Sequence, residues 1–221
     1  MASTLIVLAV IMGVVVFWLV RQTINVQPWA EEGLIGEHHA GGPFSISPVK
    51  IGLIVFLAVV SSLFSLFVSA YFQRMDFGDW TVAPEPVVLW LNTVLLIFSS
   101  FFFQRARNAA IKSQVEGVKS NLLIAGLLTC AFIGGQLWAW QEFHNDGYIL
   151  TSNPANAFFY LLTAAHALHI LGGLWVWSKT VFKLQNDIEV HNVRVAVELC
   201  AIYWHFLLLV WLVLFALLLS T

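Results

Sequence analysis

Three histidines are the side chains whose type and spacing could support chemistry in this chain. His166 and His169 are spaced i, i+3, so on a helix they share one face. His205 belongs to the next apolar stretch, and all three lie about 15 Å from the end of a stretch, near the middle of a membrane. Such a set could hold a metal ion or ligate a haem iron. Alternatively, three neutral histidines could form hydrogen bonds between helices. The residue types alone leave both interpretations open.

Glu198 is the one clear carboxylate inside an apolar stretch. A carboxylate at membrane depth is costly, so it either extends to the interface or pairs with a neighbouring helix or subunit. The sequence contains no Gly-rich phosphate loop, no nucleophile–base pair and no chain of membrane carboxylates. A proton pump or an ion-coupled carrier is expected to have such a chain. His38 and His39 could bind a metal weakly, although a solvated loop is the simpler interpretation.

Membrane-spanning helices are the elements that must position these residues. Hydrophobic residues make up 60% of the 221 residues and charged residues only 10%, whereas soluble chains have about a quarter charged. The net charge of −2 argues against nucleic acid as a partner. The sequence therefore predicts an all-α, polytopic transmembrane helix bundle with about six spanning helices, since a span needs about 20 apolar residues. The six stretches are Thr4–Val20, Ile51–Phe72, Val87–Phe103, Leu122–Trp140, Ala157–Trp177 and Val195–Leu219.

Basic residues gather in alternate connections between these stretches. If those connections face the cytoplasm, nine of the ten Lys and Arg lie inside, as the positive-inside rule requires. The exception is Arg74. Both termini are then expected on the outer, periplasmic side, which agrees with an even number of helices. The nine inside residues are Arg21, Lys50, Arg105, Arg107, Lys112, Lys119, Lys179, Lys183 and Arg194.

Glycines inside the predicted helices are interpreted as packing positions. Small residues let helix backbones approach closely in lipid, where no hydrophobic effect drives helices together. Two of the predicted helices carry such positions. They are Gly126, Gly134 and Gly135 in one helix, and Gly172 and Gly173 in the next.

Three segments carry motifs that together resemble one known family. The third stretch begins Pro-Val-Val-Leu-Trp-Leu-Asn-Thr (Pro86–Thr93). The fifth contains Phe-Phe-Tyr-Leu-Leu-Thr-Ala-Ala-His-Ala-Leu-His-Ile-Leu-Gly-Gly (Phe158–Gly173), and the sixth contains Glu-Leu-Cys-Ala-Ile-Tyr-Trp-His-Phe-Leu-Leu-Leu-Val-Trp (Glu198–Trp211). The chain thereby resembles subunit III of the haem–copper terminal oxidases, over roughly Pro48 to Leu219. Residues 1–47 are expected to form an extra N-terminal transmembrane helix and a long cytoplasmic loop, and residues 48–221 a five-helix bundle like that of subunit III.

The resemblance implies a supporting role without catalytic residues. Subunit III of this family binds no haem and no copper, and it packs against the catalytic subunit, which reduces oxygen to water and pumps protons. Its helices form a V-shaped cleft that holds lipids. It helps to sustain proton uptake and to protect the catalytic site, and a role in oxygen access is attributed to it. The resemblance makes the histidines structural, and the expected structural, subunit or lipid contacts are Asn92, His166, His169, Glu198, Tyr203, Trp204 and His205.

The expected partners are the haem–copper subunit I, subunit II and membrane lipids. Haems and copper are expected in the partner subunits, and bound phospholipid in this one. The expected location is the inner (plasma) membrane, as a multi-pass protein. Two alternatives stand beside this interpretation. One is the subunit III-like protein associated with nitric oxide reductase, and the other, from a different class, is a small membrane carrier or channel.

The sequence departs from the family pattern at two positions. Val60 and Leu208 stand where many members have an intramembrane acid. Both changes remove a carboxylate from the membrane interior, which calls into question any role of those acids in holding cleft lipids or assisting protons. The fuller family form has seven helices and some bacterial members have five, so six predicted helices suggest loss of the first.

Overall fold

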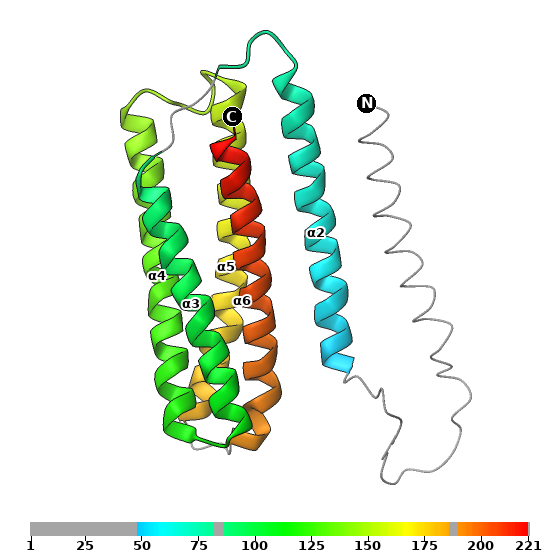
Figure 1. Cartoon of the computed structure of the whole chain (residues 1–221), viewed down its shortest axis with the longest axis vertical. Coiled ribbons are helices and arrows are strands. Elements are labelled where there is room, and N and C mark those ends of the chain that lie inside the picture. The colour runs from blue at the N-terminus through cyan, green and yellow to red at the C-terminus, as the bar shows by residue number, and fades with distance from the viewer. Residues whose placement is uncertain (1–47, 82–85, 186–189, 221) are drawn as a thin grey trace, which may run out of the picture. The chain divides into compact units, whose positions relative to one another are not determined.

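The computed structural model describes residues 48–81, 86–185 and 190–220, and all regular secondary structure in them is helical. These residues form five helices that are long and apolar enough to cross a membrane. They confirm the predicted all-helical membrane fold and five of its spans. The first predicted span, Thr4–Val20, and the loop with His38 and His39 lie outside the described residues, so the count of six and the side of the termini stay predictions. The five helices are α2 (Pro48–Met75), α3 (Val88–Ile111), α4 (Val115–Asn145), α5 (Pro154–Gln185) and α6 (Val190–Leu219) (Figure 1).

The helices extend beyond the apolar stretches that predict them. The α3 helix continues past Phe103 to Ile111 and so includes Arg105 and Arg107. The α5 helix runs to Gln185 and includes Lys179 and Lys183. An apolar stretch measures only the hydrocarbon thickness, whereas backbone hydrogen bonding continues into the interface, where long basic side chains reach water. Hydropathy therefore locates each helix but not its ends.

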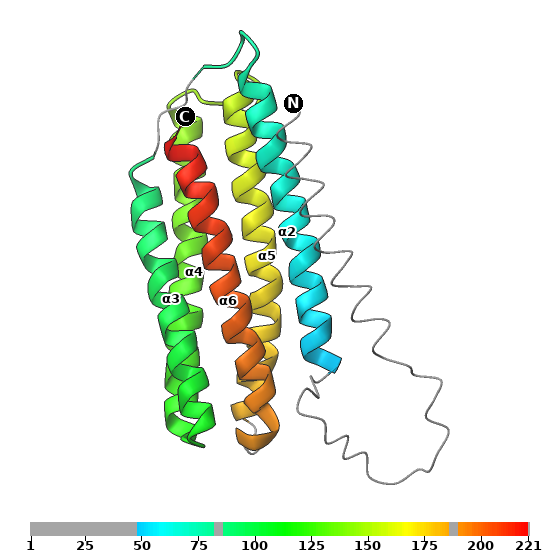
Figure 2. The same ribbon diagram turned by 45° about the vertical axis from the view of Figure 1, so that its right-hand side comes forward.

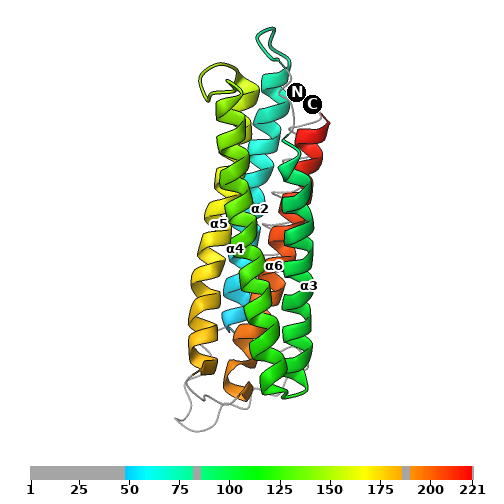
Figure 3. The same cartoon turned by 90° about the vertical axis from the view of Figure 1, so that its left-hand side faces the viewer.

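Four of the helices form a closed antiparallel ring. The α3 helix packs against α4 and α6, and α5 packs against the same two helices. The α3–α4 turn, the last turn of α5 and the first turn of α6 lie at one end, and the α4–α5 connection lies at the other (Figures 1 and 3). This is the topology of an up-and-down four-helix bundle. The tight α3–α4 turn is closed by Ser113, whose φ of 54° is left-handed.

The chain divides into two compact units, Met1–Ala58 and Val59–Thr221, and the helical ring belongs to the second. Within that unit, the part of α2 after Val59 contacts α5 and α6 through apolar side chains. The residues of this cluster, which we call the α2 seam, are Val60, Phe64, Tyr71, Leu162, Val210, Leu214 and Leu217. At the end of the seam near the C-terminus of α2, Trp80 and Phe158 pack their rings against Tyr71.

The exterior of the helices is as apolar as the interior. Trp204, Trp211, Phe103 and Phe132 are fully buried. Leu127, Leu168 and Leu209 are among many large apolar side chains that remain exposed. Such a surface suits a lipid solvent, in which helices associate through close packing and hydrogen bonds rather than through the hydrophobic effect. The interior contacts must therefore supply the specificity of the fold.

Three of the predicted packing glycines receive a side chain from a neighbouring helix. A Cβ atom at Gly126 would lie 2.1 Å from the indole ring of Trp177, and one at Gly173 would lie 2.6 Å from the ring of Tyr203. A Cβ at Gly135 would lie 2.0 Å from Asn92 Oδ1. These positions confirm the packing interpretation. Gly134 and Gly172 differ, because nothing lies within 4 Å of a Cβ at either position.

Candidate functional site

The contact between α3 and α6 (Figure 2) carries hydrogen bonds at three levels, and His205 is at the middle one. Its Nδ1 lies 2.5 Å from the hydroxyl of Ser100, and its Nε2 lies 3.0 Å from Oε1 of Gln104. Both partners are on α3. With the Gln104 amide in this orientation, Nε2 carries the proton and donates it, while Nδ1 accepts from the Ser100 hydroxyl. Both ring nitrogens are thus engaged, which leaves His205 no free nitrogen for a metal.

Trp211 and Trp204 donate from α6 to threonines on two other helices. Nε1 of Trp211 donates to Thr93 Oγ1 on α3 at 2.9 Å. Nε1 of Trp204 donates to Thr129 Oγ1 on α4 at 3.0 Å, and the Thr129 hydroxyl lies 2.8 Å from that of Ser99 on α3. All five side chains are buried. These two hydrogen-bonded groups join α6 to α3 and α4, and both indole N–H donors are satisfied.

Glu198 finds its partner within the chain. Its Oε1 lies 3.4 Å from a terminal nitrogen of Arg107 on α3, and both side chains are partly buried. Of the two interpretations of Glu198, the structure favours a partner on a neighbouring helix. The separation exceeds the ~2.8 Å of a strong charge-assisted bond, so we expect this pair alone to stabilise the fold little.

These contacts repeat at nearly regular intervals along both helices. On α6 the positions are 198, 205 and 211, and on α3 the partners are 107, 100 and 93. Steps of seven residues return to the same helix face after about two turns, as in coiled coils. Both steps on α3 and the first step on α6 are of this kind, whereas the step from 205 to 211 is six residues and places Trp211 about 120° around the helix from His205. We call this series, together with Gln104, Trp204, Thr129 and Ser99, the polar ladder. It fixes the register of α3 against α6.

His166 and His169 behave differently from His205. His166 is fully buried among the rings of Phe64, Phe132 and Trp211, with its own ring centroid 5.2 Å from that of Trp211. Neither of its ring nitrogens has a hydrogen-bond partner among the described residues. His169 bonds within its own helix, through Nδ1 and the carbonyl of Ala165 at 2.7 Å. The alternative of three histidines bonding between helices is therefore correct only for His205.

The remaining predicted residues, Tyr203 and Asn92, are both buried at helix contacts. The hydroxyl of Tyr203 donates to the carbonyl of His169 at 2.9 Å, which ties α6 to α5. Asn92 Nδ2 makes only a long bond of 3.4 Å to Gln136 Oε1, and the side chain fills the notch at Gly135. Among the described residues, no three His, Cys, Asp or Glu side chains are grouped as a metal site would require.

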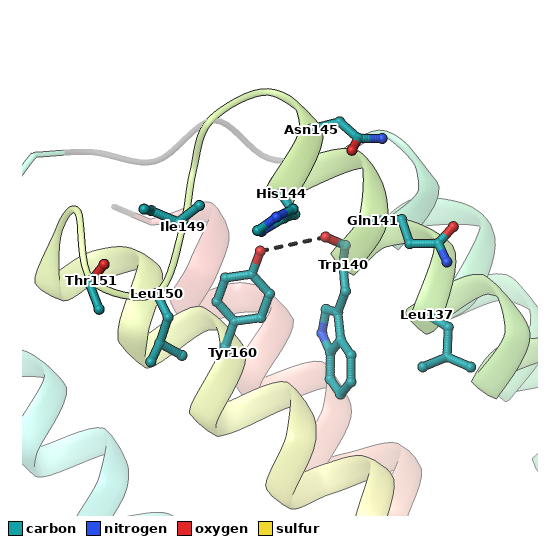
Figure 4. Close-up of a pocket in the computed structure, with 9 residues that line it drawn as sticks. All are labelled: Leu137, Trp140, Gln141, His144, Asn145, Ile149, Leu150, Thr151 and Tyr160. Carbon is teal, nitrogen blue, oxygen red and sulfur yellow. Dashed lines mark hydrogen bonds between the residues drawn. The ribbon is translucent and has the colours of Figure 1, made fainter.

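A cavity of about 710 Å³ opens at the other end of the bundle, where α4 turns into α5. Trp140 and Tyr160 face it, and the Tyr160 hydroxyl lies 3.5 Å from the carbonyl of Trp140 (Figure 4). The carbonyl of Tyr148, at 3.2 Å, is the nearer acceptor for the single proton of that hydroxyl. His144 and Gln141 also line it, beside a mainly aliphatic wall. No sequence motif predicted this cavity, because a loop folded over two helix ends forms it.

Several residues of the polar ladder are absent from the sequence-based set. They are Thr93, Ser99, Ser100, Gln104, Arg107, Thr129 and Trp211. A weak signal for them exists in the sequence. Arg107, Ser100 and Thr93 lie seven residues apart in a stretch that is mostly aromatic and aliphatic. That spacing indicates one polar face on α3, although it cannot identify the helix that this face meets.

Comparisons with known proteins agree with the family suggested by the motifs. A family model described as cytochrome c oxidase subunit III matches residues 1–220, so the match begins well before Pro48. The chain is 30% identical over 173 residues to the cytochrome c oxidase subunit 3 of Thermostichus vulcanus, covering 76% of this chain and 85% of that one. It is 29% identical over 175 residues to the probable cytochrome c oxidase subunit 3 of Nocardia farcinica, with the same coverage. With the Synechocystis subunit it shares 28% over 172 residues, 75% of this chain and 72% of that one. The chain therefore belongs to the cytochrome c oxidase subunit III family.

Proposed function

We propose that this chain is the subunit III of an aerobic respiratory terminal oxidase and that it supports a haem–copper catalytic subunit without carrying a redox centre. The observation that carries the proposal is His205, whose two ring nitrogens are both occupied by α3 side chains. The histidine-rich motifs of α5 and α6 then serve helix packing. The similarity to cytochrome c oxidase subunits favours an oxidase over the nitric oxide reductase and carrier alternatives.

The membrane side of each end follows from charge. The α3–α4 turn, the last turns of α5 and the first turns of α6 share one end of the ring, and seven basic residues lie in or near them. The connections at the opposite end carry Asp76, Asp79 and Asp146. By the positive-inside rule, the basic end faces the cytoplasm. We place the protein in the inner membrane in this orientation, with subunits I and II as its partners.

The absence of two family acids is consistent with packing as the main contribution of this subunit. Val60, at one of those positions, is 2% exposed and lies within the apolar α2 seam. A carboxylate there would be surrounded by hydrocarbon, which disfavours its charged form. Support of the catalytic subunit in this protein would therefore come from helix packing and bound lipid rather than from a membrane carboxylate at this position.

Copurification tests the proposal. A tagged chain purified gently from its native membrane should bring down a haem–copper subunit in about equal amount, with the haem absorption of an oxidase. The same chain expressed alone should fold without a Soret band. A stoichiometric haem spectrum from the isolated chain would contradict the proposal. So would a tagged chain that carries no haem protein while a strain lacking it respires oxygen normally.

A further inference from the structure

A small cavity at the cytoplasmic end of the α3–α6 contact is lined by two arginines and one glutamate. It measures about 100 Å³, and its lining residues are Arg107, Ile111, Arg194 and Glu198. That volume is roughly three times the ~30 Å³ that a water molecule occupies in the liquid. It can therefore hold one tetrahedral oxyanion in place of solvent.

Arg107 has donors to spare in this cavity. A guanidinium carries five N–H donors, and Arg107 makes only the long 3.4 Å contact to Glu198 among the described residues. Its Nε is buried and has no acceptor there. A buried charged donor without a partner is costly, so an acceptor from outside the chain would be favoured at this position. Arginine forks bind phosphate oxygens in pairs, which makes a phosphate group a good match.

The formal charges in the cavity also select among anions. Arg107 and Arg194 contribute two positive charges and Glu198 one negative charge, which leaves a net charge of +1. A phosphodiester carries a single negative charge and neutralises this set, whereas a phosphate dianion exceeds it. Glu198 thus tunes the site toward a diester, in addition to orienting Arg107.

The surroundings of the cavity match a lipid. Ile111, which lines it, and Val195, next to Arg194, are both largely exposed apolar side chains. They lie where an acyl chain would leave a head group bound at the basic end of the bundle. Basic pockets between transmembrane helices on the cytoplasmic side bind lipid head groups in other membrane proteins.

We propose that Arg107 and Arg194 bind the phosphodiester of an anionic phospholipid from the cytoplasmic leaflet. The site deepens the proposed function, on which it rests only for the membrane orientation, by naming the residues that bind lipid, and all four lining residues belong to this chain. Copurification of a haem protein and binding of a lipid are separate readouts, so the two proposals can fail independently.

The test measures lipid binding to the full chain by native mass spectrometry after delipidation. The chain is titrated with phosphatidylglycerol and, separately, with phosphatidylcholine. Wild type should retain phosphatidylglycerol preferentially, and the Arg107→Gln/Arg194→Gln variant should bind it about tenfold more weakly, the loss of a charge-assisted pair of bonds. Arg105→Gln is the matched control, because Arg105 is on the same helix but lies over the ring of Phe101. Its affinity should equal that of wild type.

The Glu198→Gln variant distinguishes anion binding by the two arginines from a purely structural role of these arginines. It breaks the Arg107 contact but raises the net charge of the cavity, so phosphatidylglycerol binding should persist or strengthen about twofold. If the arginines only held the fold together, Glu198→Gln would instead weaken lipid binding as the arginine variants do. That result would overturn the proposal, and so would equal phosphatidylglycerol affinity in wild type and the double arginine variant.

Two further arms identify the source of the bound group. If inorganic phosphate binds wild type, depends on Arg107 and Arg194, and phosphatidylglycerol shows no preference over phosphatidylcholine, the oxyanion site stands with free phosphate as its ligand. If the arginine substitutions release a partner subunit from the assembled complex while lipid retention is unchanged, the cavity receives a protein carboxylate and the proposal is wrong.

Discussion

The polar ladder and the α2 seam join helices by different chemistry. Along the ladder, Trp204 and Trp211 each donate to one hydroxyl, and His205 holds two side chains of α3. Along the α2 seam, Val60 and Phe64 pack against apolar side chains, and the ring of Phe64 also lies against the rings of His166 and His169, without a hydrogen bond between them. Hydrogen bonds have fixed partners, whereas apolar surfaces tolerate several arrangements of similar volume. We infer that the ring of α3 to α6 has one register and that α2 is attached more permissively.

The largest expected effect comes from filling a notch in the ring. Gly173→Leu forces a side chain against the ring of Tyr203, and we expect it to lower the free energy of unfolding by about 3 kcal/mol. Gly172→Leu is the matched control, because a Cβ there meets nothing within 4 Å. Denaturation of the chain in mixed micelles measures both. Equal losses from the two substitutions would mean that the notch is not needed for close packing.

Removing the hydroxyl of Thr129, which accepts from Trp204 in the polar ladder, should lower the free energy of unfolding somewhat less. Thr129→Val leaves the buried indole N–H of Trp204 without a partner, which costs about 2 kcal/mol of unfolding free energy. The companion variant Thr129→Val/Trp204→Phe removes both partners. Its loss should be smaller than the sum of the two single losses, as a double-mutant cycle detects. Strictly additive losses would show that the two groups do not interact.

A substitution in the α2 seam should cost less again. Phe64→Leu exchanges one apolar side chain for another among mainly apolar neighbours and breaks no hydrogen bond to them, and we expect a loss of about 1 kcal/mol or less. Phe103→Leu in the ring is the comparison, because Phe103 is fully buried with its ring centroid 4.1 Å from that of Trp204. Its loss should be clearly larger. Equal losses would remove the distinction between a specific ring and a permissive seam.

The five described helices and the family could be predicted from the sequence, whereas the ladder could not. A spanning helix is set by local hydropathy, and the motifs around His166 and Glu198 indicate the family. Trp204 and Thr129, however, are 75 residues apart, and Trp211 and Thr93 are 118 apart. A polar residue in an apolar stretch needs a hydrogen-bond partner, but the local sequence does not identify the helix that carries this partner.

His166 is a second residue whose contacts could not be predicted from the sequence, because the hydrogen-bond partner expected for it is not found. A buried histidine is expected to form hydrogen bonds, because an unpaired polar group in hydrocarbon is costly. In this structure it lies against three aromatic rings with no hydrogen-bond partner among the described residues. The i, i+3 spacing with His169 predicts a shared face, but the contacts of that face depend on rings from α2, α4 and α6.

The smallest expected effect lies in the connection after α2, outside the membrane. Arg74 binds Asp79 through two hydrogen bonds, which holds the pKa of that carboxyl below its usual range. A lowered pKa contributes stability that is complete above about pH 4, the ordinary pKa of aspartate, and is lost as the pH falls through the lower value. Hydrogen exchange of residues 76–81 should therefore speed up at acidic pH relative to Asp79→Asn. Identical pH profiles in the two proteins would exclude the ion pair as the cause.

The most direct test of the central claim, that the histidines serve packing and not a redox centre, is the haem spectrum of the assembled complex with His205→Leu. The substitution leaves Ser100 and Gln104 without their partner on α6. We expect less of the chain to be retained in the complex, while the Soret position and the haem content per catalytic subunit stay unchanged. A shifted Soret band, or loss of one haem per complex, would contradict this account.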